Sequence, residues 1–177
     1  MLETPRLWLR RWRDADREPY YRLNADPRVR EFFPACLTRA ESDAQVDEFE
    51  GHLKRYGFGL YAVELKETAE FLGFVGLAWV PFELHFMPCV EIGWRLDTAF
   101  WNRGLATEGA RECLRYAFEE LALDEVVAMT VPANVRSRRV MEKLGMTRDA
   151  GGDFDHPRIA EGHPLRRHVL YRIKSVC

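Results

Sequence analysis

Apolar and polar residues alternate with different periods along the chain, and these periods predict the order of strands and helices. Residues 7–10 follow the two-residue period of a strand. Asp16 is a suitable N-cap for a first helix, because Pro19 would fall in its first turn, where a missing N–H does no harm. Asp26 and Pro27 predict the start of a second, short helix.

A longer helix is predicted to begin at Thr38. Thr38 and Glu41 form a capping-box pair, and apolar residues follow at helical spacing until Gly57 ends the run. From residue 60 the period changes to that of strands, with a polar turn over residues 66–70 that predicts an antiparallel hairpin. The strands expected in the rest of the chain are residues 60–65, 71–80, 90–96, 126–131 and 168–173.

Two helices are expected between the later strands. Ala110 begins a series of apolar residues at the spacing of a strongly amphipathic helix. Asn134 would cap a second helix that ends with Gly145 at its C′ position, and a polar loop is expected over residues 151–164. This order of elements predicts an α/β domain with a mixed sheet, and we expect residues 1–177 to form a single domain.

Composition narrows the class of protein. The 177 residues are 47% hydrophobic, enough for one substantial core, and the 26 basic and 28 acidic residues indicate no polyanion-binding surface. The four cysteines have no C-x-x-C pair and no histidines at zinc spacing, which argues against a metal site or a disulfide framework. The charged first residues do not resemble a signal peptide, and no apolar run reaches the ~18 residues of a membrane span. We therefore expect a soluble, cytoplasmic protein that binds neither nucleic acid nor a membrane.

The segment after residue 100 has the features of an anion-binding turn. Gly104 lets the backbone approach a ligand closely, and the small Ala106 leaves the first N–H groups of the following helix uncovered. These amides and the positive end of the helix dipole suit a pyrophosphate. An ordinary turn between a strand and a helix has the same appearance in sequence.

Two motifs in this region resemble the acetyl-CoA site of the GCN5-related N-acetyltransferases, the GNAT superfamily. WNRGLA at residues 101–106 matches the family's Q/R-x-x-G-x-G/A loop at the glycine and the alanine, but has Trp101 at the first position. NVRSRRVMEKLG at residues 134–145 is similar to the family's N-x-x-S-x-x-x-x-x-K-x-G signature. The resemblance is greatest to the branch of the RimJ/RimL ribosomal-protein N-terminal acetyltransferases and extends loosely over nearly the whole chain. Two motifs at fitting separation are more specific than either alone.

The resemblance implies a GNAT fold, an α/β fold in which helices flank a mixed, mostly antiparallel central sheet and a splayed strand pair holds acetyl-CoA. The pair would be residues 90–96 and 126–131, with a bulge near Gly93. The pantetheine arm would bond to strand backbone, and a strand N–H would stabilise the oxyanion as the amine attacks directly. The residues expected at the acetyl-CoA site are Ile92, Gly93, Trp94, Arg103, Gly104, Leu105, Ala106, Thr107, Asn134 and Ser137.

The same resemblance indicates candidates for proton transfer. Glu91 is the candidate general base; alternatively, it is an edge residue or pairs with Arg95, which shares its strand face. Ser137 is favoured as the acid that protonates the CoA thiolate, and Tyr171 is its competitor. The structural alternatives are helix capping for Ser137 and core packing for Tyr171. His168, beside a polar loop expected to overhang the acceptor site, is a further candidate.

These features predict transfer of an acetyl group from acetyl-CoA to a primary amine, on a protein N-terminus or a small molecule. No metal is expected, and a homodimer is a candidate assembly. One alternative is a non-catalytic acyl-CoA-binding sensor or scaffold with the same fold, and a more remote one is a different nucleotide-binding α/β domain. Turnover on a panel of amines, compared with binding of acetyl-CoA, separates these functions.

Overall fold

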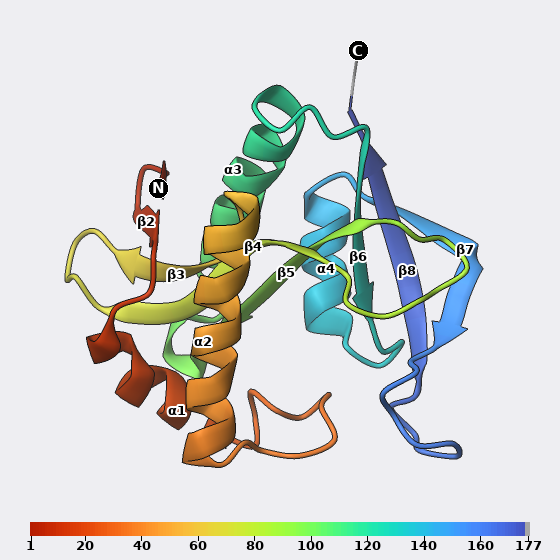
Figure 1. The fold of residues 1–177 in the computed structure, drawn as a ribbon, viewed down its shortest axis with the longest axis horizontal. Helices are drawn as coiled ribbons and strands as arrows, with labels where there is room; N and C mark the ends of the chain where they lie inside the picture. Colours follow the sequence, from red (N-terminus) through yellow and green to blue (C-terminus); the bar gives the residue numbers. More distant parts are fainter. Residues whose placement is uncertain (176–177) are drawn as a thin grey trace.

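The structure, a computed structural model, describes residues 1–175 and contains one eight-stranded mixed sheet (Figure 1). Its strands lie in the order β1-β2-β3-β4-β5-β6-β8-β7, and only β5 and β6 run parallel to each other. The strands are β1 (Leu2–Glu3), β2 (Leu7–Arg10), β3 (Leu60–Leu65), β4 (Phe71–Trp79), β5 (Val90–Leu96), β6 (Glu125–Thr130), β7 (Thr147–Asp155) and β8 (Arg167–Lys174). This mostly antiparallel sheet is the architecture that the sequence predicts.

Helices cover both faces of the sheet. They are η1 (Asp14–Asp16), α1 (Arg17–Ala25), α2 (Arg39–Tyr56), η2 (Thr98–Phe100), α3 (Leu105–Glu119) and α4 (Val135–Lys143). Neighbouring residues of β4 identify the two faces, because successive side chains of a strand point to opposite sides. The Phe74 ring packs against Tyr20 of α1 and Phe49 of α2, whereas Val75 lies against Gly109 of α3.

The helix boundaries follow the capping residues. The Thr38 hydroxyl accepts a hydrogen bond from the Glu41 N–H, and the Glu41 carboxylate accepts one from the Thr38 N–H at 2.8 Å, which completes the expected capping box of α2. Gly57, with φ of 78°, ends that helix in the left-handed conformation that glycine adopts without strain. Asn134 likewise caps α4.

Parallel strands β5 and β6 meet at one end and then separate. Within residues 1–175, a single register position joins them, with Glu91 opposite Val127. On its other edge β5 pairs with β4 at every position. The expected bulge near Gly93 is wrong, because that register is continuous; the register shifts lie elsewhere, in the β3–β4 pair between Val63 and Glu64 and in the β7–β8 pair between Asp149 and Phe154. The splay itself is present, and it comes from the separation of β6 rather than from an irregularity in β5.

Two other expectations about local structure are wrong. Residues 26–30 form turns and no second short helix, because the Asp26 carboxylate accepts the Arg28 N–H at 2.8 Å and so stabilises a tight turn. The predicted polar loop over residues 151–164 begins as part of β7, which pairs with β8 as the last strand of the sheet. Polar, glycine-containing edge strands lack the apolar alternation by which a strand is recognised.

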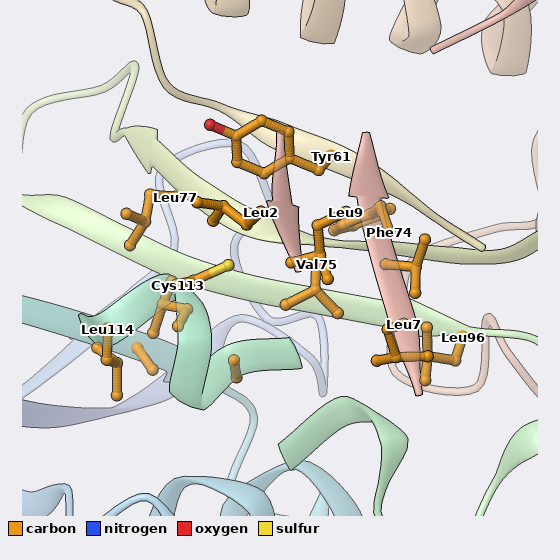
Figure 2. Packing of buried hydrophobic residues seen from close by; sticks show 14 of the residues in the cluster. Leu2, Leu7, Leu9, Tyr61, Phe74, Val75, Leu77, Leu96, Cys113 and Leu114 are labelled. Atoms are coloured by element: carbon orange, nitrogen blue, oxygen red, sulfur yellow. The ribbon is translucent and has the colours of Figure 1, made fainter. Parts of the chain in front are cut away.

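The main hydrophobic core lies between the sheet and the helices. Leu7, Leu9, Val75 and Ile92 are almost completely buried in it. Figure 2 shows part of this core, with side chains from β2, β4 and β5 near those of α3. None of the helices described is long and apolar enough to cross a membrane.

Candidate active site

The gap between β5 and β6 exposes strand backbone inside the sheet. Beyond the contact of Glu91 with Val127, the two strands share no further register position within residues 1–175. Backbone N–H and C=O groups that no neighbouring strand satisfies need other partners. A ligand with amide groups can supply them, as an added strand does at a sheet edge. Of the expected site residues, Ile92, Gly93 and Trp94 lie on this part of β5.

The start of α3 offers further unpaired amides. Gly104 is its N-cap, with φ of 77°, and no side chain caps the helix. Asn102, two residues earlier, also has a positive φ of 60°. Left-handed residues before a helix turn successive N–H groups toward a common point, where they bind anions. The amides of Leu105, Ala106 and Thr107 therefore lie where the sequence predicts a phosphate site, although the Leu105 side chain itself is buried.

A surface pocket of ≈ 510 Å³ adjoins this helix start. Gly104 and Thr107 line it, together with the cationic side chains of Arg6, Arg111 and Lys143. Glu3, Glu108 and Glu112 line the same pocket and balance these charges, so the helix amides are the main anion-binding feature here. Arg103, the other cation expected here, is exposed, and its guanidinium lies 5.7 Å from the centre of the Phe100 ring.

Glu108, which also lines this pocket, has its charge compensated. Its carboxylate accepts hydrogen bonds from the Thr4 hydroxyl at 2.6 Å and from Arg6 Nε at 2.6 Å. Burial acts to raise the pKa of Glu108, but these hydrogen bonds outweigh it and hold the pKa below its usual value. The pairing with Arg6, which the sequence analysis did not predict, ties the turn between β1 and β2 to the first turn of α3.

Glu91 has the properties of a general base near neutral pH. Burial raises the pKa of this carboxyl to about 7, and a backbone contact with Met129 acts weakly in the opposite direction. Glu91 lies at the point where β5 separates from β6. A carboxylate with a pKa near the working pH is substantially ionised and still binds a proton well, as a general base must.

The structure does not pair Glu91 with Arg95. The Arg95 guanidinium instead donates from Nη1 to the Asn24 carboxamide oxygen at 2.8 Å and to the Tyr20 hydroxyl at 3.2 Å. Both partners belong to α1, so the face of β5 that carries Glu91 and Arg95 is the face covered by α1 and α2. Among the described residues no salt bridge involves Glu91, and the ion-pair explanation for this carboxylate is wrong.

Asn134 and Ser137 stand at the start of α4. The Asn134 side-chain oxygen accepts the Ser137 N–H at 3.2 Å, and its amide nitrogen donates to the Thr130 hydroxyl at 3.0 Å. The capping expected of Asn134 is therefore present. Because the cap uses the backbone N–H of Ser137, it leaves the Ser137 hydroxyl free for another partner.

Tyr171 of β8 approaches the same helix from the sheet. Its ring is buried, and its hydroxyl accepts a hydrogen bond from Arg138 Nε at 3.2 Å. Arg138 also donates from Nη1 to the Pro132 carbonyl at 3.0 Å, which fixes the guanidinium. Since the tyrosine oxygen accepts from Arg138, its proton remains available for donation.

His168 lies on β8, beyond the strand that faces Glu91. In the β6–β8 register Val127, which faces Glu91, is opposite Arg172, so His168 is four residues further along β8, roughly 13 Å at the rise of a strand. Its ring is 4.9 Å from that of His156, and burial lowers the pKa of His168. The structure therefore places His168 in an aromatic cluster with His156 and Phe154.

The loop over residues 80–89 covers the sheet beside Glu91. In Figure 1 it extends from β4 across β6 and β8 toward β7 before it returns to β5. Its buried members pack with Val127 and Leu170, and Phe86 meets Phe154 of β7 at 5.5 Å. This loop forms one wall beside the charged face of β5.

No group of three or more His, Cys, Asp or Glu side chains within residues 1–175 is arranged to hold a metal ion. Cys36, Cys89 and Cys113 are free thiols, and Cys177 lies outside the described residues.

The sheet, its gap and the uncapped helix together form an α/β domain with a candidate site for an extended ligand that carries negative charge. The family model for the acetyltransferase (GNAT) domain matches residues 6–147, and the chain belongs to this family. It is 34% identical over 146 residues to the uncharacterized protein YkkB of Bacillus subtilis, an alignment that covers 82% of this chain and 84% of that protein.

Solved structures show the same fold. An acetyltransferase from Agrobacterium tumefaciens is 28% identical, with a TM-score of 0.79 over 98% of this chain and 94% of the other. RimL, a ribosomal L7/L12 alpha-N-protein acetyltransferase in complex with coenzyme A, is 15% identical, with a TM-score of 0.76 over 97% of this chain and 95% of the other. The expected GNAT fold is confirmed, and its structural neighbours include the RimJ/RimL branch.

Proposed function

We propose that this protein, acting as one domain in the cytoplasm, transfers the acetyl group of acetyl-CoA to a primary amine on a protein N-terminus or a small molecule. Membership of the GNAT family supports an N-acetyltransferase, and the identity of donor and acceptor is our proposal. One observation carries it. The carboxylate of Glu91, with a pKa of about 7, stands where β5 leaves β6, at the head of the gap that leads toward α3.

Backbone groups provide most of the donor site. The amides of Leu105, Ala106 and Thr107, with Arg103 at the rim, bind the pyrophosphate, because α3 has no side-chain cap that competes for them. The strand edge at Ile92, Gly93 and Trp94, assisted by the Asn134 amide, hydrogen-bonds the pantetheine arm. When bound, acetyl-CoA supplies an acyl thioester that an amine can attack.

Glu91 takes the proton of the acceptor amine, directly or through a water. A lysine-like amine is mostly protonated at neutral pH and cannot attack until it loses that proton. A carboxylate with an ordinary pKa near 4 would be a weaker base, so its burial beside the gap suits Glu91 to this work. A backbone N–H of β5 stabilises the negative charge that develops on the acetyl oxygen.

The departing thiolate requires a proton from the α4 side. Ser137 is our preferred donor, because its hydroxyl lies in the first turn of the helix and its backbone N–H alone is used by the cap. Tyr171 is the second candidate, since its hydroxyl accepts from Arg138 and can donate its proton elsewhere.

A combined binding and turnover measurement tests the function. Acetyl-CoA affinity is measured by calorimetry, and release of the CoA thiol is followed with a panel of peptides, polyamines, amino acids and aminoglycosides. We expect acetyl-CoA to bind and at least one amine to be acetylated, with the product identified by mass spectrometry. Tight binding without turnover on any amine would identify the chain as an acyl-CoA-binding sensor instead.

A further inference from the structure

Two arginines on the α1 and α2 side of the sheet have no acidic partner. Arg30 is only 8% exposed and Arg95 is partly buried, yet neither forms a salt bridge with a carboxylate of residues 1–175. Both guanidiniums lie on the ring of Phe33, at 4.1 Å and 4.4 Å from its centre. Burial lowers the pKa of both arginines, that of Arg30 to about 10, and for Arg30 the neighbouring charge of Arg95 acts in the same direction.

A third buried arginine shows how this protein normally compensates such a charge. Arg10 is 7% exposed and binds two carboxylates, Asp16 at 2.6 Å and Glu64 at 2.8 Å. Arg95 instead has neutral oxygen partners, and its buried Nε has no hydrogen-bond partner among the described residues. Burying a cation without an anion costs free energy, which the ring contacts and neutral hydrogen bonds offset in part and a bound anion would offset further.

Arg95 lies on the same strand face as the candidate base, and Arg30 reaches Arg95 from the loop after α1 through the ring of Phe33. Glu91, Gly93 and Arg95 alternate along β5, so the two charged residues are separated by roughly 13 Å of strand, less the reach of their side chains. Gly93 between them has no side chain, and a Cβ placed there would meet no atom closer than 3.9 Å. A small group therefore fits between the base and the guanidiniums, beside the side chains of Leu60 and Phe74.

We propose that Arg95 and Arg30 bind a carboxylate of the acceptor, so that the preferred substrate is an amine that carries a carboxylate several ångströms from its nitrogen. This inference rests on the proposed acetyl transfer and specifies its acceptor. The amine lies toward Glu91, the chain crosses Gly93, and the carboxylate meets the guanidiniums. Arginine suits this role because its planar donors match a carboxylate. Phe33, which is 37% exposed, covers the two cations and moves aside when the carboxylate enters.

The test compares each acid with its own amide. The acceptors are glycine, β-alanine, γ-aminobutyrate and 5-aminovalerate with their amides, together with the peptides Ala-Glu-Ala and Ala-Gln-Ala, blocked at the C-terminus. We expect kcat/KM to be at least about tenfold higher for the acid in at least one pair, the effect of one charge-assisted hydrogen bond. The free acids and the acidic peptide distinguish a small molecule from a protein N-terminus.

Substitution identifies the residues responsible. Arg95→Met keeps most of the apolar contact with Phe33 but removes the charge, and Arg30→Met is the second variant. We expect each to reduce the preference for the acid to about twofold or less and to leave acetyl-CoA affinity unchanged. Arg10→Met is the matched control, which should lower the urea midpoint of unfolding and retain the preference for the acid. A preference for the amides, or one that survives both variants, would overturn the inference.

A binding measurement separates this inference from the proposed function. Binding of the preferred acid to protein saturated with CoA is measured by calorimetry, where no acetyl transfer is required. Binding that Arg95→Met abolishes supports the carboxylate site even if turnover is absent, in which case the transfer reaction alone has failed. If acids and amides are acetylated at equal rates, the proposed acetyl transfer is supported and the proposed carboxylate site is wrong.

Discussion

The two faces of β5 differ in what their side chains contact. Ile92 and Leu96 are buried in the core on the α3 side, where they contact other apolar residues. Glu91 and Arg95, on the face toward α1 and α2, are partly buried charges without an ion-pair partner in the described chain. One face of β5 therefore stabilises the fold, and the other carries the candidate base and the proposed carboxylate-binding arginine. Single substitutions on each face should affect stability and activity separately.

The largest effect is expected on the apolar face. Ile92→Ala leaves a cavity in a close-packed core and should lower the free energy of unfolding by about 3 kcal/mol. Urea denaturation measures this loss. At low temperature, where the variant is folded, kcat should stay within about threefold of the parent protein, because Ile92 contributes only its backbone to the proposed donor site and no reacting group changes. A stable but inactive Ile92→Ala protein would contradict the division between the faces.

The adjacent residue should give the opposite result. Glu91→Gln removes the base and should lower kcat/KM by about 100-fold at pH 7, with partial recovery at higher pH as more free amine is present. In the parent protein kcat/KM should rise with pH through about 7, where Glu91 ionises. Initial rates between pH 5.5 and 9.5 provide the comparison. If both proteins have the same pH profile, Glu91 is not the base.

The pH dependence of the free energy of unfolding gives a second, independent test of the raised pKa of Glu91. The pKa of Glu91 is raised by folding, so its ionisation favours the unfolded chain and stability is lost as pH rises from about 4.3, the value of a free glutamate, through about 7. A glutamine at this position does not ionise, so the variant does not lose stability in this pH range. Glu91→Gln should therefore unfold at a higher urea concentration than the parent at pH 8, and the difference should disappear near pH 4.

A smaller effect is expected at the proton donor on α4. Ser137→Ala should lower kcat by about tenfold with little change in acetyl-CoA affinity, because the cap uses only the backbone N–H. Tyr171→Phe is the matched variant, and it removes the hydroxyl that Arg138 contacts. A greater loss of kcat in Tyr171→Phe than in Ser137→Ala would transfer the role of acid to the tyrosine.

The smallest effect should come from placing a methyl group at Gly93, between the two charged residues. Gly93→Ala places a methyl group where the nearest atoms are 3.9 Å away, so stability should change by less than about 1 kcal/mol, while KM for the acceptor rises about threefold. Its cross-strand partner provides the control. At Gly76 a Cβ would lie 2.1 Å from the Gly59 carbonyl oxygen, so Gly76→Ala should destabilise the protein instead.

Local sequence signals predicted much of this arrangement. The capping residues Thr38 and Asn134 locate α2 and α4, and alternation alone places Glu91 and Arg95 on one face of β5. The position of the acetyl-CoA loop came from the motif around Gly104 and its family resemblance. These features depend on neighbours within a few residues, which sequence patterns record directly.

Long-range contacts could not be predicted in this way. Arg30 meets Arg95 across 65 positions of sequence because a turn-rich loop folds over the sheet, and no periodicity marks that contact. The raised pKa of Glu91 likewise depends on burial by elements distant in sequence. The aromatic cluster around His168 likewise joins β7 and β8 in a way that the sequence pattern does not record.

The single register position between β5 and β6 makes the sheet two smaller sheets, one of five strands and one of three. Acetyl-CoA bound in the gap would hydrogen-bond to both strands and join the two smaller sheets. The cosubstrate would therefore also stabilise the folded protein. Its contribution grows as RT ln(1 + [L]/Kd), about 2.7 kcal/mol at one hundred times Kd. Amide hydrogens along the facing edges would then exchange with solvent slowly when CoA is abundant and quickly when it is scarce.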